Sequence, residues 1–468
     1  MPSPRTAAPD QAGGTTMLGH APSAAQLTSG IAPGAHPAIG HGWQLWRQPL
    51  EFLESLSAIG DLVEIRLGPQ PAFVPCHPEI VWRILTNDSV YDKGGPVMDR
   101  LRDFVGNGLG TSTHQDHRRQ RRLIQPAFHP ALIESYAAVM EDEISTLTRD
   151  WKDGQEIDVF PQLYGFALRT VTRTLFSTTV DAETIEVVRR SFDTVFNGSF
   201  LRMLTPPTLR RIPTPANRRF QTAVKNLLGT VDRMIEGHRK EATDSGGILP
   251  ILLGSGSGPD GQEMSNAEIR DHLITMLLGG GDTTAAALAW ALHLLSTHPE
   301  AERRLQEEVD QVLGGRPAEW KDLPQLTFTS RVLTETLRLY PPGWLLTRTT
   351  TQEVELAGRH LPPGTAILFS PVTVQRRPDL FPDPHAFDPD RWLPEYASGL
   401  PRGAFVAFGG GARKCIGDTY GMAETVLALA TIASRWSLSP VSGVQIRPSR
   451  LSVSLHPEHL PLRLHARR

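Results

Sequence analysis

The chain has 468 residues, of which 40% are apolar and 21% are charged, so it is long enough to bury a large core. Its formal net charge of -3 gives no basic field around the protein, which argues against nucleic acid as a partner. The two cysteines, Cys76 and Cys415, are too few for a disulfide framework or a four-sulfur zinc site, and they favour a reducing, cytoplasmic location.

Residues 1–40 are rich in Ala, Pro, Gly, Ser and Thr and contain no apolar signal-peptide core. We predict a disordered tail here, followed by a single domain over residues 41–468. The most apolar stretch is Leu273–Leu295, but it contains Asp282 and three consecutive glycines. We therefore expect a buried core helix there, and no membrane span.

Apolar residues recur with the helical period along most of the chain. The pattern predicts helices over Trp43–Ser57, Pro78–Thr86, His117–Pro126, Ala131–Trp151, Pro161–Leu175, Thr184–Asn197, Ala216–Ala242, Ala267–Ser296, Pro299–Val312 and Phe328–Leu339. A last helix is predicted at about Gly417–Arg435, before a β-like C-terminal segment.

Short β-prone segments surround these helices. A hairpin is predicted from Asp61–Leu67 and Ala72–Pro75, and further strands from Leu345–Thr349, Val354–Leu356 and Ala366–Phe369. An irregular stretch rich in Pro and Asp follows, from residue 377 to residue 408. The fold class is therefore mainly α with a minor β portion, and a meander of this length in a compact protein usually has a function.

The strongest chemical signal is the segment 408–417, in which Cys415 lies between a Gly-rich loop and the start of a helix. The helix dipole and free amide N–H groups at such a position favour a thiolate. The glycines remove side chains, so the backbone can approach a flat cofactor closely, and Arg413 can reach an acidic group on it. A buried structural cysteine is the alternative for a lone cysteine, but the spacing of Phe, Gly, Arg, Cys and Gly argues against it.

This segment resembles the haem-binding signature F-x-x-G-x-R-x-C-x-G of cytochromes P-450 at every fixed position, and the resemblance extends from about residue 40 to the C-terminus. It implies a large helical domain with a small β-rich region, and haem b between the long central helix and the Cys-bearing helix. Cys415 would be the axial ligand of the iron. Phe408, Gly409, Gly417 and Gly280 would contact the cofactor.

A second motif, Gly279–Thr284, lies inside the long apolar helix. Three glycines in a helix interior cost roughly 1 kcal/mol each relative to Ala, so something must offset about 3 kcal/mol. A distorted helix that opens a groove for a small ligand is one cause, and a close helix crossing is the other. The stretch resembles the family's oxygen-activation motif, which implies that Thr283 would hydrogen-bond dioxygen and Asp282 would relay protons.

A third motif is structural rather than catalytic. Glu335 and Arg338 are spaced i,i+3 on a helix, a pair that alone says nothing. They resemble the family's E-x-x-R because Phe387–Trp392 follows at a fitting distance. The resemblance implies that Arg391 completes a buried network that supports the haem loop, with Trp392 where the family more often has Phe.

A basic segment, His117–Phe128, resembles the family helix that holds a haem propionate. His117 and Arg121 are spaced i,i+4 and can face one side of a helix. Arg348 and Arg413 would complete the clamp, since guanidinium groups pair with carboxylates in bidentate fashion. The alternative is a solvated helix face. The other arginines, Arg118, Arg119 and Arg122, would point outward toward an acidic redox partner.

The substrate is expected to be an apolar small molecule, because no charged residue stands out as a carboxylate anchor. By family position, the pocket candidates are Met98, Leu101, Phe104, Val105, Phe196, Phe200, Met203, Leu278, Trp344 and Leu345, each of which could equally be core. Three segments, 117–128, 216–220 and 387–395, are also similar to bacterial sesquiterpene-oxidising members of the family. A terpene is therefore the first choice of substrate.

The resemblance implies a monooxygenase that uses dioxygen and two electrons supplied from outside. The chain has no flavin or NAD(P)H module, so a ferredoxin with its reductase is the expected donor. A fatty-acid hydroxylase and a peroxide-driven peroxygenase are the alternatives within the fold. A haem-thiolate sensor without turnover is the alternative from another class, and the acid–Thr pair argues against it.

Overall fold

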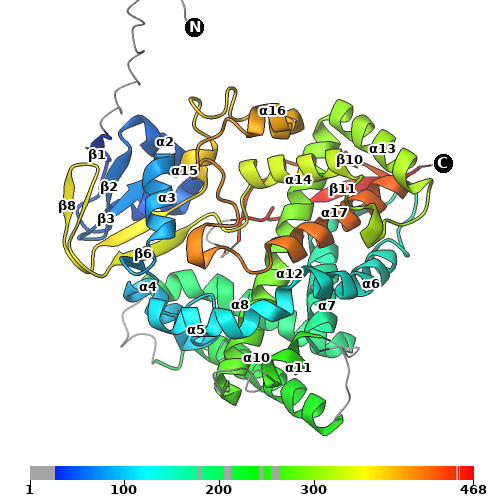
Figure 1. Cartoon of the computed structure of the whole chain (residues 1–468), viewed down its shortest axis with the longest axis horizontal. Helices are drawn as coiled ribbons and strands as arrows, with labels where there is room; N and C mark the ends of the chain where they lie inside the picture. The colour runs from blue at the N-terminus through cyan, green and yellow to red at the C-terminus, as the bar shows by residue number, and fades with distance from the viewer. Residues whose placement is uncertain are drawn as a thin grey trace, which may run out of the picture.

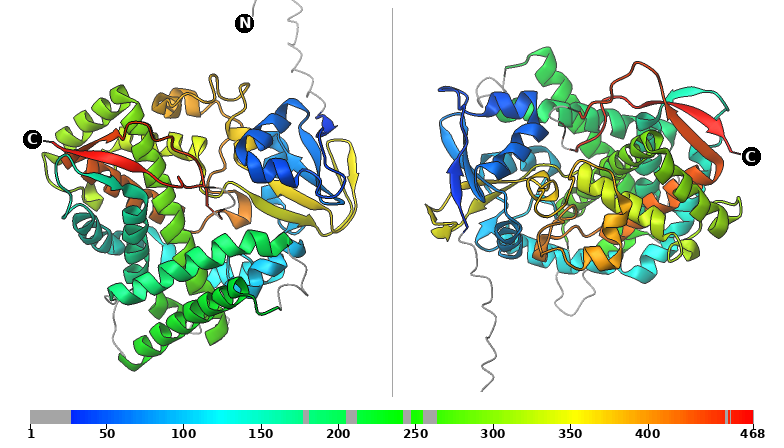
Figure 2. Two further views of the ribbon diagram at one scale, coloured as in Figure 1. Left: turned by 180° about the vertical axis from the view of Figure 1, so that it is seen from behind. Right: turned by 90° about the horizontal axis from the view of Figure 1, so that it is seen from above.

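The computed structural model describes residues 27–176, 181–204, 212–241, 247–254, 264–449, 452 and 454–467. A β-rich part, coloured largely blue and yellow in Figure 1, lies beside a larger helical part. Helix α12 (Asn266–Thr297) runs through the helical part, and the view from behind in Figure 2 shows it crossing the middle of the molecule.

The larger sheet joins both halves of the chain. Its strand order is β1-β2-β3-β9-β6-β4, in which β3 pairs in parallel with β9. The six strands are β1 Ser29–Ile31, β2 Leu62–Leu67, β3 Gln70–Pro75, β4 Tyr91–Asp92, β6 Leu346–Thr350 and β9 Ala366–Phe369. A second sheet has the order β10-β11-β5 and a hairpin pairs β7 with β8. These strands are β5 Glu156–Asp158, β7 Val354–Leu356, β8 Arg359–Leu361, β10 Trp436–Pro440 and β11 Pro461–Ala466.

The helices make up most of the remaining chain. The first half contains α1 Gly42–Arg47, α2 Pro49–Ser55, α3 Pro78–Thr86, α4 Gly95–Val105, α5 His114–Ile124, α6 Pro130–Leu147, α7 Val159–Phe176, α8 Ala182–Leu204 and α10 Pro215–Glu241. The second half contains α11 Ile248–Leu253, α12, α13 Pro299–Leu313, α14 Thr327–Leu339, α15 Val372–Gln375, α16 Pro394–Ala397 and α17 Asp418–Arg435. Short 3-10 turns are η1 Leu56–Ala58, η2 Gln125–Phe128, η4 Trp320–Asp322, η5 Pro389–Trp392 and η6 Gly411–Arg413.

Helix α12 is central because it is apolar on nearly every side. A capping box between Ser265 and Glu268 starts it, and most of its residues from Ile269 to Leu295 are buried. Such a helix is stable only when other elements cover it completely, and α7, α10, α14 and α17 all contact it. The sequence prediction of a buried core helix at this position is confirmed.

The elements with local start signals have the predicted bounds. Helix α3 covers Pro78–Thr86 as predicted, because Pro78 occupies its first turn and the His77 side chain accepts the backbone N–H of Glu79. The helix predicted over Trp43–Ser57 is instead divided into α1 and α2. Gln48 leaves the helical conformation there, and Pro49 begins the second helix.

The predicted tail is wrong for residues 27–40, which belong to the folded domain. Strand β1 pairs in parallel with β2, and Ala32, which directly follows β1, is buried. The backbone of Gly40 bonds to that of His36 in both directions, which closes a turn against the hairpin. Helix α4 was also not predicted. Among the described residues, no helix has the length and apolar character that crossing a bilayer requires.

Candidate active site

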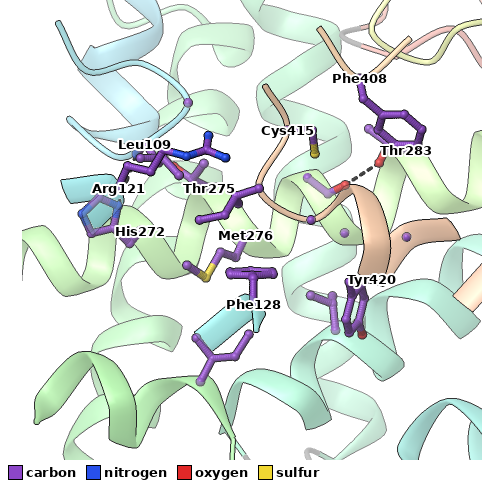
Figure 3. A pocket seen from close by; sticks show the side chains of 18 of the residues that line it. Leu109, Arg121, Phe128, His272, Thr275, Met276, Thr283, Phe408, Cys415 and Tyr420 are labelled. Carbon is purple, nitrogen blue, oxygen red and sulfur yellow. Dashed lines mark hydrogen bonds between the residues drawn. The ribbon is translucent and has the colours of Figure 1, made fainter. Parts of the chain in front are cut away.

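A cavity lies between α12, the loop 408–417 and the start of α17, and helices α5, α7 and α11 complete its wall (Figure 3). The empty space, counted together with its open mouth, amounts to ≈ 1060 Å³. Of the residues predicted to contact haem, those that line it are Phe408, Cys415, Gly417, Gly280, His117, Arg121 and Arg413; Gly409 and Arg348 do not.

The loop that carries Cys415 is held in a tight shape. The backbone N–H of Cys415 donates to the carbonyl of Phe408 at 2.8 Å. Gly409 and Gly411 have φ values of 70° and 63°, a region that side chains disfavour. A Cβ atom on Gly411 would also lie 2.4 Å from the carbonyl oxygen of Leu85. These glycines therefore let the loop pack on α3 and present the sulfur to the cavity.

The sulfur of Cys415 opens into the cavity rather than into bulk solvent. Burial raises the pKa of its thiol, while the backbone N–H of Gly417 at the start of α17 lowers it. The sequence led us to expect a thiolate favoured by the helix end, and in the structure burial of the sulfur opposes that effect. A bound metal cation reverses this balance, since a coordinating thiol is deprotonated outright.

Thr283 lies on the cavity side of α12, beside Cys415 in Figure 3. Its hydroxyl donates to the carbonyl oxygen of Gly279, one turn earlier. The helix is continuous through the three glycines, so the predicted distortion is not a break. A Cβ on Gly280 would lie 2.7 Å from Cγ2 of Val171 on α7, so a close helix crossing accounts for this glycine.

Asp282 faces away from the cavity. Its side chain is 8% exposed, and it is not among the residues that line the cavity. Burial raises the pKa of its carboxyl, while His456 and Ser454 on the C-terminal segment lower it. Thr283 and Asp282 are therefore neighbours in sequence whose side chains lie on different sides of α12.

Arg413 is held in place by three contacts within the protein. Its guanidinium contacts Asp88 at 3.2 Å, Asp92 at 2.9 Å and the carbonyl oxygen of Ser112 at 2.7 Å. Burial lowers its pKa, and the two carboxylates raise it. The side chain is 1% exposed, so these contacts fix both its position and its charge.

Other basic groups near Arg413 lack sufficient partners. Burial lowers the pKa of His117 to about 3 and that of Arg348 to about 10, and in each case Arg413 adds repulsion. Nδ1 of His117 and Nε of Arg348 are buried and have no hydrogen-bond partner among the described residues. Lys93, which lines the cavity, donates to the carbonyl oxygen of Gly110 at 2.7 Å. Its pKa is lowered well below the usual value by burial and then by Arg348 and Arg413.

These four side chains, Lys93, His117, Arg348 and Arg413, form what we call the basic rim. Its carboxylates, Asp88 and Asp92, both pair with Arg413. A cluster of buried basic side chains with orphaned donors fits a ligand that brings carboxylates. The sequence analysis missed Lys93, which has no motif around it and is recognisable only by its position beside Arg348 and Arg413.

The arginines of the predicted basic helix, α5, have different surroundings. Nη1 of Arg121 donates to the carbonyl oxygen of Lys414 at 2.6 Å, so this side chain supports the Cys415 loop. Arg118 is exposed, as we expected for a docking surface. Arg119 does not point freely outward, because it forms an ion pair with Glu268 of α12.

The Glu335–Arg338–Arg391 network is present and buried. Both Glu335 and Arg338 are 0% exposed, and two bonds of 2.8 and 2.7 Å join them. Nε of Arg391 lies 3.4 Å from Oε1 of Glu335. The indole N–H of Trp392 donates to Oε2 of Glu335 at 2.9 Å, a contact that Phe at this position cannot make. We call this cluster the brace.

The predicted substrate residues that the structure describes do not line the cavity. Leu101, Phe104, Val105 and Leu278 belong to the large helical core, Trp344 and Leu345 to a second cluster, and Met98 is buried; the side chains of Phe196, Phe200 and Met203 lie outside the described residues. The cavity wall is formed instead by Leu109, Val171, Ile248, Thr275 and Met276. These residues sit within ordinary helical patterns, so periodicity alone could not distinguish them from core.

Comparisons with known proteins agree with this geometry. A family model described as "Cytochrome P-450" matches residues 32–463. The chain is 51% identical to pentalenene oxygenase of Streptomyces avermitilis, over 94% of this chain and 98% of that protein. It is 48% identical to cyclooctatin synthase of Streptomyces melanosporofaciens, over 89% and 92%. The solved cytochrome P-450DA heme domain has a TM-score of 0.85 at 23% identity and covers 94% and 98% of the two chains.

Proposed function

Because the chain belongs to the cytochrome P-450 family and is thus a haem-dependent monooxygenase, we propose that it oxidises a terpene. The observation that carries this proposal is the largely apolar cavity that lies over Cys415 and Thr283. The similarity to pentalenene oxygenase and cyclooctatin synthase extends along the whole described chain and supports a terpene over other apolar molecules. Electrons come from outside the chain, and dioxygen supplies the inserted oxygen atom.

We assign the haem as haem b, and Cys415 would hold its iron through the thiolate sulfur. Phe408, Gly417 and Gly280 would contact the macrocycle, and the basic rim with Arg121 would hold its propionates. When bound, the haem activates dioxygen for insertion into an unactivated C–H bond, for which a thiolate ligand is suited. The orphaned Nδ1 of His117 and Nε of Arg348 support this placement, because propionate oxygens are acceptors that both atoms lack.

Thr283 and Asp282 are proposed as the polar groups of the oxygen step. The Thr283 hydroxyl gives its hydrogen to the carbonyl oxygen of Gly279, which leaves its oxygen free to accept a hydrogen bond from the cavity. Burial raises the pKa of Asp282 and so favours the form of its carboxyl that carries a proton. Since it faces the C-terminal segment, it would exchange that proton on the side away from the cavity.

The electron donor is proposed to be a ferredoxin with its reductase, in the cytoplasm. Arg118 and Lys414 are exposed on the side of the molecule that carries the Cys415 loop, and Arg121 joins α5 to that loop. Such a basic surface attracts an acidic protein, and the attraction is screened by salt.

The decisive test uses the purified holoprotein. The reduced, carbon monoxide-treated protein should show the strongly red-shifted Soret band of thiolate ligation, and Cys415→Ala should lose it. Titration with sesquiterpene hydrocarbons should then shift the haem spin state, and turnover with ferredoxin, reductase and NAD(P)H should give a hydroxylated product. A spin shift with fatty acids alone, or turnover with hydrogen peroxide alone, would favour the fatty-acid hydroxylase or the peroxygenase instead.

A further inference from the structure

Exposed apolar side chains gather at the N-terminal edge of the β-rich part. Seven large apolar side chains of the described residues are exposed, and four of these lie close together in the sequence: Ile31, Ile39, Trp43 and Trp46. Single exposed apolar residues are normal on a protein surface, whereas a group of them marks a contact site. We call these four side chains the aromatic patch. Neither the haem site nor the brace includes them.

The backbone around the aromatic patch is folded back on itself. Nε2 of His41, which is buried, lies 3.2 Å from the carbonyl oxygen of Ala32, directly after β1. The backbone N–H of Gly42 donates to the carbonyl oxygen of Ile39 at 3.1 Å, so Ile39 lies at the start of α1. These contacts bring the end of β1 beside the start of α1. The patch therefore occupies one region, at the edge of the β-rich part where β1 is labelled in Figure 1.

Helix α1 has apolar residues on two faces. Leu45 is 6% exposed and packs in the apolar cluster beneath the larger sheet. Trp43 and Trp46, spaced i,i+3, share the outer face, where their ring centroids are 4.8 Å apart and their exposed fractions are 50% and 40%. The outer face of a surface helix normally carries polar side chains, so two indole rings there need an explanation.

The two exposed indoles also differ from buried ones in their hydrogen bonds. The indole N–H groups of Trp151, Trp290 and Trp344 each donate to an oxygen atom of the protein. Those of Trp43 and Trp46 form no hydrogen bond within the part of the chain that the structure describes. An indole with a free N–H suits a boundary between an apolar and a wet phase, because the ring enters the first and the N–H stays in the second.

The stretch that carries the patch is nearly free of charge. From residue 27 to residue 50 the one formally charged residue is Arg47, although 21% of the chain is charged. Arg66 of β2 lies beside the same turn, because its backbone N–H donates to Nδ1 of His41 at 2.9 Å. Both arginine side chains are exposed, and neither forms an ion pair with a described residue. Glu64, two residues before Arg66, pairs with Arg359 instead.

We propose that the aromatic patch binds the surface of an anionic lipid bilayer, with Arg47 and Arg66 at the lipid headgroups. Basic side chains beside an apolar surface attract anionic headgroups, and tryptophan favours the boundary between headgroups and acyl chains. The exposed residues from 33 to 38 are Pro, Gly, Ala and His, which offer few of the side-chain hydrogen bonds that the rim of a protein interface uses. This chemistry fits a bilayer better than a partner protein.

The protein would lie on the membrane, since no described helix has the length and apolar character to cross it. This inference goes beyond the proposed function, because binding to lipid needs neither substrate nor electrons. It also agrees with that function, because an apolar terpene partitions from water into a bilayer.

The first test is cosedimentation of the full-length holoprotein with vesicles of phosphatidylglycerol and phosphatidylethanolamine at low salt. The parent should sediment with the vesicles, and the double variant Trp43→Gln with Trp46→Gln should bind about tenfold more weakly. Phe at both positions keeps apolar rings and should retain most of the binding. Tyr396→Gln is the matched control, because Tyr396 is 63% exposed on α16 and is not part of the patch. A parent that stays in the supernatant, or a Gln variant that binds as the parent does, would overturn the proposal.

A second measurement asks whether the indoles enter the bilayer. All nine tryptophans belong to the described residues, and Trp43 and Trp46 are the two that are exposed. Phosphatidylglycerol vesicles with bromine on the acyl chains should quench the fluorescence of the parent and leave that of the Gln double variant unchanged. Equal quenching of the two proteins would place the membrane contact elsewhere and refute the role of the patch.

The arginines can be tested by the choice of lipid. Arg47→Gln with Arg66→Gln should weaken binding to phosphatidylglycerol vesicles and remove most of its salt dependence, because headgroup attraction is screened by ions. Arg402→Gln, at an exposed position of the meander, is the control and should bind as the parent does. A parent that binds phosphatidylcholine and phosphatidylglycerol vesicles equally well would exclude the headgroup contact.

The inference and the proposed function can fail separately. Every variant of the patch should keep the carbon monoxide spectrum and the spin shift of the parent, because none of these residues lines the cavity. Sedimentation velocity without lipid should give a monomer. A dimer that the Gln double variant loses, together with a lack of vesicle binding, would assign the patch to a second copy of the chain and overturn the proposal.

Discussion

Two buried clusters of side chains, the brace and the basic rim, are built in opposite ways. In the brace, the Glu335 carboxylate pairs with Arg338 and Arg391. It also accepts hydrogen bonds from the indole N–H of Trp392 and the backbone N–H of Asp388. Arg338 in addition donates to three carbonyl oxygens. In the basic rim, basic side chains outnumber carboxylates, and two donor atoms have no partner among the described residues. The brace pairs its charged groups within the protein, although Nε of Arg391 makes no hydrogen bond, whereas the rim offers unpartnered donors to an anionic ligand.

The difference separates stability from binding. A buried ion pair is costly to assemble but very costly to break, so a satisfied network serves to fix the backbone around it. When a ligand supplies the missing charge to an unsatisfied cluster, it gains binding free energy, because it pairs groups that were buried without partners. Removing a residue from each cluster should therefore change different properties of the protein.

The largest effect is expected in the brace. Arg338→Met leaves Glu335 buried without its main partner, so the free energy of unfolding should fall by about 3–5 kcal/mol. Urea denaturation of the holoprotein measures this loss. The double variant Glu335→Gln with Arg338→Met removes both charges and should recover part of it. A single variant as stable as the parent would show that the brace does not support the fold.

An acid titration of the apoprotein separates the rim from the brace. The pKa of His117 is lowered to about 3 in the fold, so the unfolded chain binds a proton first as the pH falls below 6.5. The contribution of His117 to the free energy of unfolding is therefore fully present above pH 6.5 and is lost progressively toward pH 3. After allowance for solvent screening we expect a loss of about 2 kcal/mol.

His117→Phe keeps a ring of similar size that cannot be protonated, so its stability should be flatter over this range. His465→Phe, at an exposed position of β11, is the control and should keep the slope of the parent. Denaturant midpoints at several pH values give the comparison. Identical slopes in the parent and in His117→Phe would remove His117 from the rim.

At Arg348 we expect a smaller change in the free energy of unfolding, and this change is an increase. Arg348→Gln removes a desolvated charge and an orphaned donor, so the apoprotein should become more stable by about 1 kcal/mol. Haem affinity should fall about tenfold, because a charge-assisted bond to a propionate is lost. Transfer of haem to apomyoglobin measures the second quantity. Arg331→Met, which loses its pair with Asp390 and its contact with the Phe328 ring, should leave that transfer unchanged.

The sequence predicted the fold class and most helices because their signals are local. Helix α3 has Pro78 at its start, and α12 has a long apolar run with a capping box. Helix α4 and strand β1 carry weak local patterns, and their structure comes from contacts with distant segments, such as the pairing of β1 with β2. Tertiary contacts of this kind leave no periodic trace.

The residues of the site also differ in whether the sequence could predict them. Cys415, Arg413 and His117 could be predicted because each belongs to a motif with fixed spacing. Lys93 matters through Arg348 and Arg413, which are hundreds of residues away in the sequence, so spacing did not reveal it. The direction in which Asp282 points and the pKa of the Cys415 thiol also depended on burial, which no motif reports.

The smallest effect is expected where this chain departs from the family pattern, at Trp392. Its indole supplies one of several hydrogen bonds to Glu335, so Trp392→Phe should lower the free energy of unfolding by about 1 kcal/mol. Phe keeps the ring contact with Phe405, now at 4.8 Å, so packing should change little. Combined with Arg338→Met, the change should cost less than the sum of the two, because both act on one carboxylate. Fully additive losses in urea denaturation would mean that Trp392 contributes by packing and lies outside the brace.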